Sequence, residues 1–393
     1  MDNLINDIYD IIKDYRNDDG IKISTDYIKD WINQFEEPDR LFLAEQLKEI
    51  LRKRYISKQF AKEFHKRNFI ESIVKEVNKK KAKKNHIKDP IECLKKCRFI
   101  SHQPQEKSQS ELLEFINEIL KTELNITIDQ CGIDSPEYFI YVDDILCTGD
   151  TIFQGLVGSS KKGWLYEPYN KTMSNIDYIK SNNVKIIMVL FAYHQLNIRK
   201  LFSRIQYTTS ERFNYVWWYV SGGNIDNLYK TLTSKFEFLY PLEEIKDPEI
   251  EACEQHIIEK VDEYCTDNNY DIRENYFYRP INCPKEETFF SSPDVRKRFE
   301  KIILKKSIEI YNSANNDNVR MRPLGYGLKT DKSFGYGTLL FTWRNVPFNT
   351  PLVFWYEHHN WQPLFKRKYT TYRKPLSLID IINLSKVKID EKS

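Results

Sequence analysis

The fold is decided by residues 138–151, with the sequence Tyr138-Phe139-Ile140-Tyr141-Val142-Asp143-Asp144-Ile145-Leu146-Cys147-Thr148-Gly149-Asp150-Thr151. The first five residues are apolar or aromatic and favour a buried strand. Two adjacent acids follow, and after a short bridge comes a turn at the start of an amphipathic helix. This order of strand, acids, turn and helix is typical of an α/β protein, in which ligands bind beyond the carboxyl ends of the strands.

Each part of this segment has a role if the ligand is a ribose 5-phosphate. Asp143 and Asp144 can accept hydrogen bonds from the ribose 2- and 3-hydroxyls, or orient a hydrated Mg²⁺ that those hydroxyls hold. The turn presents backbone N–H groups at a helix N-terminus, where an anion is favoured. Gly149 lets the backbone approach the phosphate closely, and the hydroxyls of Thr148 and Thr151 add donors.

The flanking sequence predicts three regions. Residues 1–90 show helical periodicity and are expected to form a basic, all-helical domain. In residues 91–235 short apolar runs alternate with helical patterns, which predicts a parallel sheet with strands at 98–101, 138–142, 185–193 and 215–221 and helices at 110–122, 151–157 and 197–205. Residues 236–393 are expected to form a C-terminal α+β extension. Its helices begin at Pro248 and Pro293, and an aromatic-rich, β-like segment covers 318–367.

The composition indicates a globular protein that stays outside membranes. Of its 393 residues 41% are hydrophobic and 30% are charged. The longest clean apolar run, Ile186 to Ala192, has the length of a strand, so no membrane span is expected. The seven cysteines are scattered, without a Cys-x-x-Cys pair, and the N-terminus carries acids where a signal peptide would be basic. We therefore expect a cytoplasmic protein with reduced thiols.

Positive charge is concentrated between Arg52 and Lys88, although the net charge of the chain is only +3. Such a cluster is consistent with a surface that binds nucleic acid or an acidic partner. It is equally consistent with a solvated helix face followed by a basic linker at 79–88.

The segment 138–151 resembles the diphosphoribosyl-binding motif of type I phosphoribosyltransferases, and is close to the form found in adenine-salvage enzymes. The resemblance implies a parallel α/β sheet of the type I kind. It also implies that Asp143 and Asp144 are the catalytic acids that hold the ribose diols and, through the ligand, Mg²⁺. The 5-phosphate would lie in the loop Cys147-Thr148-Gly149-Asp150-Thr151.

Two positions depart from that motif. Asp150 stands where glycine or lysine is usual, and it would place a negative charge near a bound phosphate. Cys147 stands where some purine enzymes have a catalytic aspartate. Upstream, the loop that binds pyrophosphate in this superfamily corresponds to residues 105–110, where Lys107 and Ser108 are the candidate ligands and Ser110 a candidate helix cap. An ordinary capped loop is the alternative there.

A narrower resemblance involves the C-terminal region. Leu-Gly-Tyr at 324–326, Pro-Phe-Asn-Thr at 347–350 and Trp-Gln-Pro-Leu-Phe-Lys-Arg at 361–367 are similar to the phosphoribosyltransferase-like family of bacterial conflict and anti-phage systems, including retron cassettes. Trp31 and Gln34-Phe35, in an N-terminal region that is helical or winged-helix-like, also fit this family. The resemblance implies a toxic effector that is held in check by another sensor or by a reverse transcriptase–DNA/RNA complex bound through the basic N-terminal region.

The role of the C-terminal arginines is left open. Arg344 and Arg367 could close over the active site as part of a hood, or they could lie on the rim of a second small aromatic core.

Three functions are consistent with the sequence: an enzyme that uses Mg²⁺-bound phosphoribosyl diphosphate with an unidentified acceptor, a catalytically silent regulator that binds such a ligand, and a nucleic-acid-associated adaptor.

Overall fold

Four parallel strands form the central sheet of the computed structural model, which describes residues 1–103, 108–219, 237–271, 274–314 and 317–367. The strand order is β2 (Cys97–Phe99), β3 (Tyr138–Val142), β5 (Lys185–Leu190) and β7 (Asn214–Tyr219). All five residues of β3 are buried. The predicted strand at 185–193 is divided in two, because β6 (Ala192–Tyr193) leaves this sheet to pair with β4 (Ile145–Leu146).

Helices cover both faces of the sheet, so side chains alternate between two hydrophobic cores along each strand. Ile140 and Val142 of β3 pack with α4 (Lys58–Asn78), α5 (Pro90–Leu94) and α6 (Ser108–Leu124). Phe139 and Tyr141 face the opposite way and pack with α7 (Asp150–Leu156), α8 (Asn175–Asn182) and α9 (Gln195–Thr209). The predicted mixed α/β fold with a parallel sheet is confirmed. The sequence prediction omitted α8, whose main signal is the capping box formed by Ser174 and Asp177.

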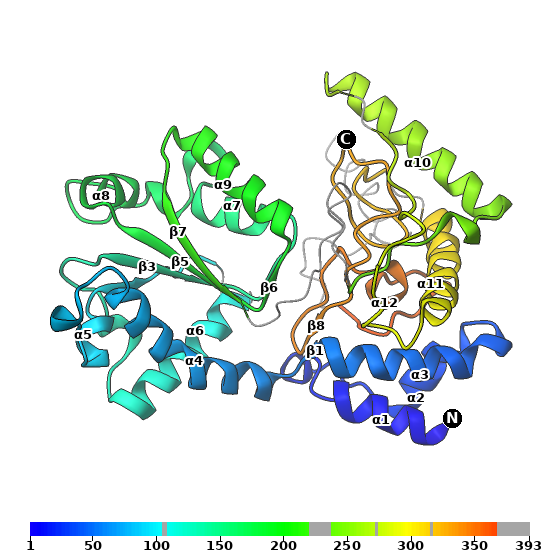
Figure 1. Cartoon of the computed structure of the whole chain (residues 1–393), viewed down its shortest axis with the longest axis horizontal. Coiled ribbons are helices and arrows are strands. Elements are labelled where there is room, and N and C mark those ends of the chain that lie inside the picture. Colours follow the sequence, from blue (N-terminus) through cyan, green and yellow to red (C-terminus); the bar gives the residue numbers. More distant parts are fainter. Residues whose placement is uncertain (104–107, 220–236, 272–273, 315–316, 368–393) are drawn as a thin grey trace, which may run out of the picture.

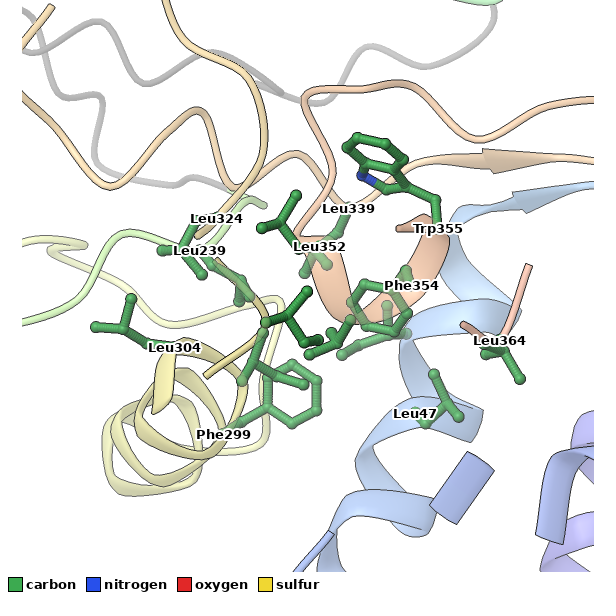
Figure 2. Packing of buried hydrophobic residues seen from close by; sticks show 14 of the residues in the cluster. Leu47, Leu239, Phe299, Leu304, Leu324, Leu339, Leu352, Phe354, Trp355 and Leu364 are labelled. Atoms are coloured by element: carbon green, nitrogen blue, oxygen red, sulfur yellow. The ribbon is translucent and has the colours of Figure 1, made fainter. Parts of the chain in front are cut away.

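The remaining helices form a second lobe, on the right in Figure 1. Its core is shared by α1 (Asp2–Ile12), α2 (Thr25–Asn33) and α3 (Glu37–Arg54) with α11 (Pro293–Ser313), α12 (Leu352–Trp355) and the loops around them. Figure 2 shows Leu47 of α3 in the same cluster as Phe299, Leu304 and Phe354 from the C-terminal region. The long helix α10 (Pro248–Asp267) packs on the same lobe.

The two lobes meet where β1 (Tyr55–Ile56) pairs with β8 (Phe341–Thr342). The boundary between the two hydrophobic cores therefore lies at β1. The sequence predicted a domain boundary near residue 90. Throughout 1–90, all of which the structure describes, β1 is the only strand, and its partner is β8 rather than a second strand of a hairpin. Of the two alternatives for the N-terminal region, the structure shows the helical one and not the winged-helix-like one, because a wing requires such a hairpin.

The β-like character expected for residues 318–367 is also wrong in large part. Within this fully described range the only strand is β8, accompanied by the short helix α12 and isolated bridges. Nearly every residue from 331 to 343 is buried, so the alternation of exposed and buried side chains that marks a half-buried strand is missing. Side chains hold the backbone instead: the Asn349 amide donates to the Tyr326 carbonyl at 2.7 Å, and the Trp355 indole donates to the Thr350 carbonyl at 2.6 Å.

The N-terminal and C-terminal segments that carry the narrower resemblance lie against each other. The indole N–H groups of Trp31 and Trp361 both donate to the Val353 carbonyl, at 3.0 and 3.2 Å. Gln34 forms a pair of hydrogen bonds with the backbone of Gln362, at 2.9 and 2.8 Å. These motifs, more than 300 residues apart in the chain, thus belong to one packing unit.

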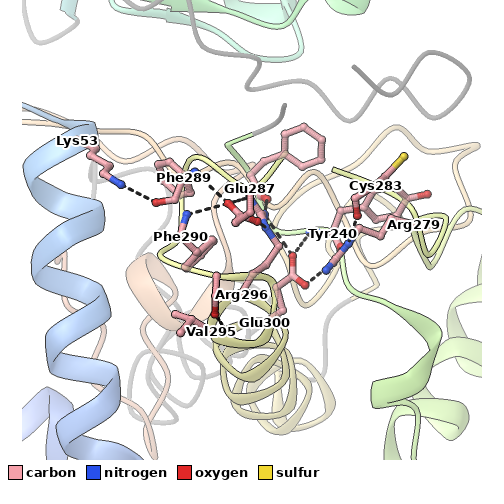
Figure 3. Close-up of polar contacts among 12 residues, drawn as sticks. Lys53, Tyr240, Arg279, Cys283, Glu287, Phe289, Phe290, Val295, Arg296 and Glu300 are labelled. Carbon is pink, nitrogen blue, oxygen red and sulfur yellow. Dashed lines mark hydrogen bonds and ion pairs between the residues drawn. The ribbon is translucent and has the colours of Figure 1, made fainter. Parts of the chain in front are cut away.

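A buried cluster of charges fastens the beginning of the C-terminal region to α11 (Figure 3). Glu300 forms ion pairs with Arg279 and with Arg296, and Arg296 also pairs with Glu287. The Glu300 carboxylate accepts from the Tyr240 N–H at 3.1 Å, and Arg296 donates to a backbone carbonyl at residue 238 at 2.9 Å. Because Glu300 and Arg296 are fully buried, each depends on its partners for compensation.

Candidate functional site

The two acids predicted as catalytic residues lie buried at the carboxyl end of β3. Asp143 is 4% and Asp144 8% exposed. The Asp143 N–H still bonds to the Val189 carbonyl of β5 at 3.0 Å, so the sheet fixes the backbone up to the first acid. The Asp143 carboxylate then accepts from Gln103 Nε2 at 3.0 Å, from Ser108 Oγ at 2.8 Å and from the Asp144 N–H at 2.9 Å.

Asp144 has fewer compensating contacts and an altered titration. Its Oδ1 accepts from the Ile145 N–H at 2.7 Å. Burial, followed by the neighbouring charge of Asp143, raises the pKa of Asp144 to about 7, against the opposing effects of the Ile145 hydrogen bond and of Arg344. Asp144 can therefore gain or lose a proton near neutral pH, which is the behaviour expected of a functional carboxyl group.

Two glutamines that sequence reasoning missed position the acids. Gln109 is almost fully buried, and its Oε1 accepts from the N–H groups of His102 and Gln103 at 3.1 and 3.0 Å. Its Nε2 donates to the Val142 carbonyl at 3.3 Å, which joins α6 to the end of β3. Gln103 in turn donates to the Tyr141 hydroxyl at 2.7 Å as well as to Asp143. No sequence pattern marks such amides, because their role depends on which loops meet in space.

Of the two candidate residues of the pyrophosphate loop, Ser108 is among the described residues. Ser108 is the first residue of α6, and its hydroxyl donates to Asp143, so the structure brings it to the acidic pair. Lys107 lies outside the described residues. Because the helix begins at Ser108, Ser110 lies within its first turn and is not the helix cap expected from the sequence.

The loop from Cys147 to Thr151 adopts the predicted turn before a helix. Gly149 has φ 77°, in the left-handed region, and a Cβ added there would lie 3.2 Å from Leu201 Cβ. The Gly149 carbonyl accepts from Phe153 N–H at 2.9 Å, which begins α7. At the start of the loop, the Cys147 carbonyl accepts from Asn197 Nδ2 of α9 at 2.8 Å. Glycine at 149 is thus required both by the backbone conformation and by the close approach of α9.

The departure at Asp150 is compensated by two arginines. Asp150 Oδ1 pairs with Arg204 of α9 at 2.7 Å, and Oδ2 pairs with Arg320 of the C-terminal region. Burial alone would raise the pKa of Asp150, but the hydrogen bonds from Arg320 and Arg204 outweigh it and hold the pKa below its usual value. No sequence pattern links Asp150 to these two arginines, which lie 54 and 170 residues further along the chain.

Two further arginines of the C-terminal region act on the acidic pair. Arg344 pairs with Glu111 of α6, and its charge lowers the pKa of Asp144. Arg367 lies 3.6 Å from the Phe348 ring centroid and donates to Asn345 Oδ1 at 3.2 Å. Burial lowers the pKa of Arg367 to about 10, while the charge of Asp144 acts in the opposite direction. Trp355, whose ring centroid lies 5.0 Å from the Arg367 guanidinium, belongs to the core shared with α1–α3, so the small separate core considered from the sequence is part of a larger one.

Much of the positive charge on α3 and α4 is paired within the chain. Lys62 and Lys66 of α4 contact Glu118 and Glu123 of α6, at 3.1 and 3.2 Å. Lys58 contacts Glu111, at 3.3 Å. These pairs reduce the net charge that this surface presents to a polyanion.

The donor set of the site fits a metal that arrives with its ligand. Among the residues that the structure describes, no group of three or more His, Cys, Asp or Glu side chains could hold a metal ion. Two adjacent carboxylates are too few to enclose Mg²⁺, but they suit a hydrated ion whose other ligands are substrate oxygens.

A parallel sheet that ends in two buried carboxylates, followed by a glycine turn and a helix, places this chain among the α/β proteins, whose ligands generally lie beyond the carboxyl ends of the strands. The sequence model of one family, PRTase-CE, matches residues 28–367, and the chain belongs to this phosphoribosyltransferase-like family. The match begins in α2 and extends to the end of the described chain, so the family includes both lobes. Neither a curated protein nor a solved structure matches the chain. In the described part of the chain, no helix has the length and apolar character needed to cross a membrane.

Proposed function

We propose that this protein is a phosphoribosyltransferase-like enzyme that binds phosphoribosyl diphosphate, or a related nucleotide, together with Mg²⁺. The observation that carries the proposal is the buried pair Asp143 and Asp144 at the end of β3, directly before the loop of residues 147–151. Two carboxylates in this position can accept hydrogen bonds from the ribose hydroxyls and can orient a hydrated cation. The family match supports the transferase class.

In the proposed reaction the bond between the anomeric carbon and the pyrophosphate oxygen breaks, and its electron pair leaves with pyrophosphate. A base, a macromolecule or water supplies the electron pair of the new bond. Bound Mg²⁺ would supply positive charge to the leaving pyrophosphate. The chain's own contribution is orientation: Gln103 and Ser108 donate to the Asp143 carboxylate and fix its position beside Asp144.

The biological role that we propose is that of a toxic effector in an anti-phage system such as a retron. Its support is the resemblance of the C-terminal motifs, which pack against Trp31 and Gln34 as one unit. A reverse transcriptase–DNA/RNA complex would be the restraining partner, and the lysine run at 79–84 the candidate contact. Expression of the protein without its partners should therefore arrest growth, and the Asp143→Asn/Asp144→Asn variant should not.

A catalytically silent regulator is the second candidate. It is favoured by the four protein donors that already contact the Asp143 carboxylate. A single-turnover assay for pyrophosphate release distinguishes the two functions. Release by the wild-type protein that is lost in the Asp143→Asn/Asp144→Asn variant supports the enzyme. Binding without release, with every tested acceptor, sinks it in favour of the regulator.

A further inference from the structure

We propose that Arg320 and Arg204 are positioning residues that neutralise Asp150 and thereby allow the loop of residues 147–151 to accept the phosphate of the ligand. The inference rests on the proposed function, and it makes the C-terminal region an obligatory part of the ligand site. It does not follow from the resemblance, since the motif usually has no acid at position 150.

The geometry assigns one guanidinium to each oxygen of Asp150. Arg204 Nη1 contacts Oδ1 at 2.7 Å, and Arg320 Nη1 contacts Oδ2. The Arg204 guanidinium also lies 3.7 Å from the Phe153 ring centroid, so the ring of α7 holds it in place. The three side chains carry a net charge of one positive unit beside the turn. Without the arginines the same position would present a negative charge to an incoming phosphate.

Arg320 reaches the loop from the other lobe, and it does not do so alone. The Tyr336 hydroxyl accepts from Asn197 Nδ2 at 3.4 Å, and the same amide holds the Cys147 carbonyl. Thr338 Oγ1 lies 3.1 Å from His194 Nε2, and the His194 N–H bonds to the Leu146 carbonyl. Both ends of the loop are therefore fastened to residues 320–338, so docking of the C-terminal region fixes the loop's conformation as well as its charge.

Asn197 offers a second sign that this place is built for a ligand. It is 1% exposed, and its Oδ1 accepts no hydrogen bond from the residues that the structure describes. A buried acceptor without a partner is costly, and a donor on a bound ligand or a water molecule would relieve that cost.

The test is the affinity for ribose 5-phosphate and for phosphoribosyl diphosphate with Mg²⁺, measured by titration calorimetry in Arg320→Ala, Asp150→Asn and the double variant. We expect Arg320→Ala to weaken binding about tenfold, because a carboxylate then faces the phosphate with one cation fewer. The double variant should bind within about threefold of the wild type, because the charge that Arg320 neutralised is gone. Arg298→Ala is the matched control, since Arg298 pairs with Asp39 at 2.8 Å between α11 and α3. It should bind as the wild type does.

Two results would overturn the inference. If Arg320→Ala binds as well as the wild type, Arg320 does not serve the loop. If the double variant binds as weakly as Arg320→Ala, Arg320 acts on the ligand directly rather than through Asp150.

A wild-type protein that binds neither probe would instead sink the proposed function, and hydrogen exchange of the loop amides then decides the inference on its own. Exchange at residues 148–151 should be at least about fivefold faster in Arg320→Ala than in the wild type and in Arg298→Ala. Equal exchange in all three proteins would contradict it.

Discussion

Replacing Asp144 with asparagine should stabilise the protein at neutral pH, although it removes a predicted catalytic group. Burial and the charge of Asp143 raise the pKa of Asp144 to about 7, from the ordinary aspartate value of 3.8. The folded protein therefore binds this proton more tightly than the unfolded chain does. The stability that the proton contributes is complete below about pH 4 and is lost as the pH rises through 7. Asparagine stays neutral, and its Oδ1 can still accept from the Ile145 N–H.

The size of the effect follows from the difference between the two pKa values. This difference in pKa between the folded and the unfolded chain corresponds to about 4 kcal/mol in the free energy of unfolding when Asp144 is fully ionised. Between pH 5 and pH 8 the linkage relation gives a change in the free energy of unfolding of roughly 2–3 kcal/mol. The variant should gain this amount relative to the wild type over that interval.

Urea denaturation of both proteins from pH 5 to pH 8 measures this difference. Groups that do not interact with Asp144 cancel, so the change with pH reports Asp144 and its interaction with Asp143. Asp143→Asn is the matched control: an amide cannot accept from all four donors that surround Asp143, so this variant should lose about 1–3 kcal/mol. A difference between the wild type and Asp144→Asn that is independent of pH would refute the reasoning.

Three other substitutions test the packing and the loop. His65 is buried in the sheet core, neither ring nitrogen has a hydrogen-bond partner within the described part of the chain, and burial lowers its pKa to about 4. His65→Leu should therefore raise the free energy of unfolding by about 1–2 kcal/mol in urea denaturation at pH 7, and a loss would contradict this. Glu300→Gln should cost about 3–5 kcal/mol in the same assay, because it removes the buried carboxylate charge that Arg279 and Arg296 share. Glu309→Gln, which breaks a surface pair on the same helix, should cost less than about 1 kcal/mol, and equal losses would argue against the buried network. Gly149→Ala should cost about 1–2 kcal/mol and weaken ligand binding, because of its positive φ and the contact with α9. In Gly155→Ala the added Cβ would meet nothing closer than 3.6 Å, so equal effects of the two alanines would rule out a special role for position 149.

The part of the fold that the sequence predicts well is local. Residues 138–151 specify strand, acids, turn and helix through their own apolar pattern and one glycine, and β3 and α7 begin within one residue of the predicted positions. The buried strand at 185–190 is recognised for the same reason, since a run of apolar residues can satisfy both faces of a parallel sheet. Local patterns of this kind do not depend on the rest of the chain.

What the sequence could not predict depends on contacts between distant segments. No sequence pattern links Arg320 to Asp150. Gln103 donates a hydrogen bond to Asp143 only because the fold brings the loop after β2 to the end of β3. The aromatic residues of 318–367 predict strands, yet many of them pack in an irregular core with α1–α3. Aromatic residues favour strands and buried loops alike, so their number alone cannot distinguish the two.

The most direct test of the central claim is isothermal titration of the purified protein with phosphoribosyl diphosphate and Mg²⁺, beside the Asp143→Asn/Asp144→Asn variant. We predict that the wild-type protein binds phosphoribosyl diphosphate and that the variant, shown to be folded by circular dichroism, does not. Equal binding by both proteins, or no binding by a well-folded wild type, would contradict the assignment of these two acids to a diphosphoribosyl site.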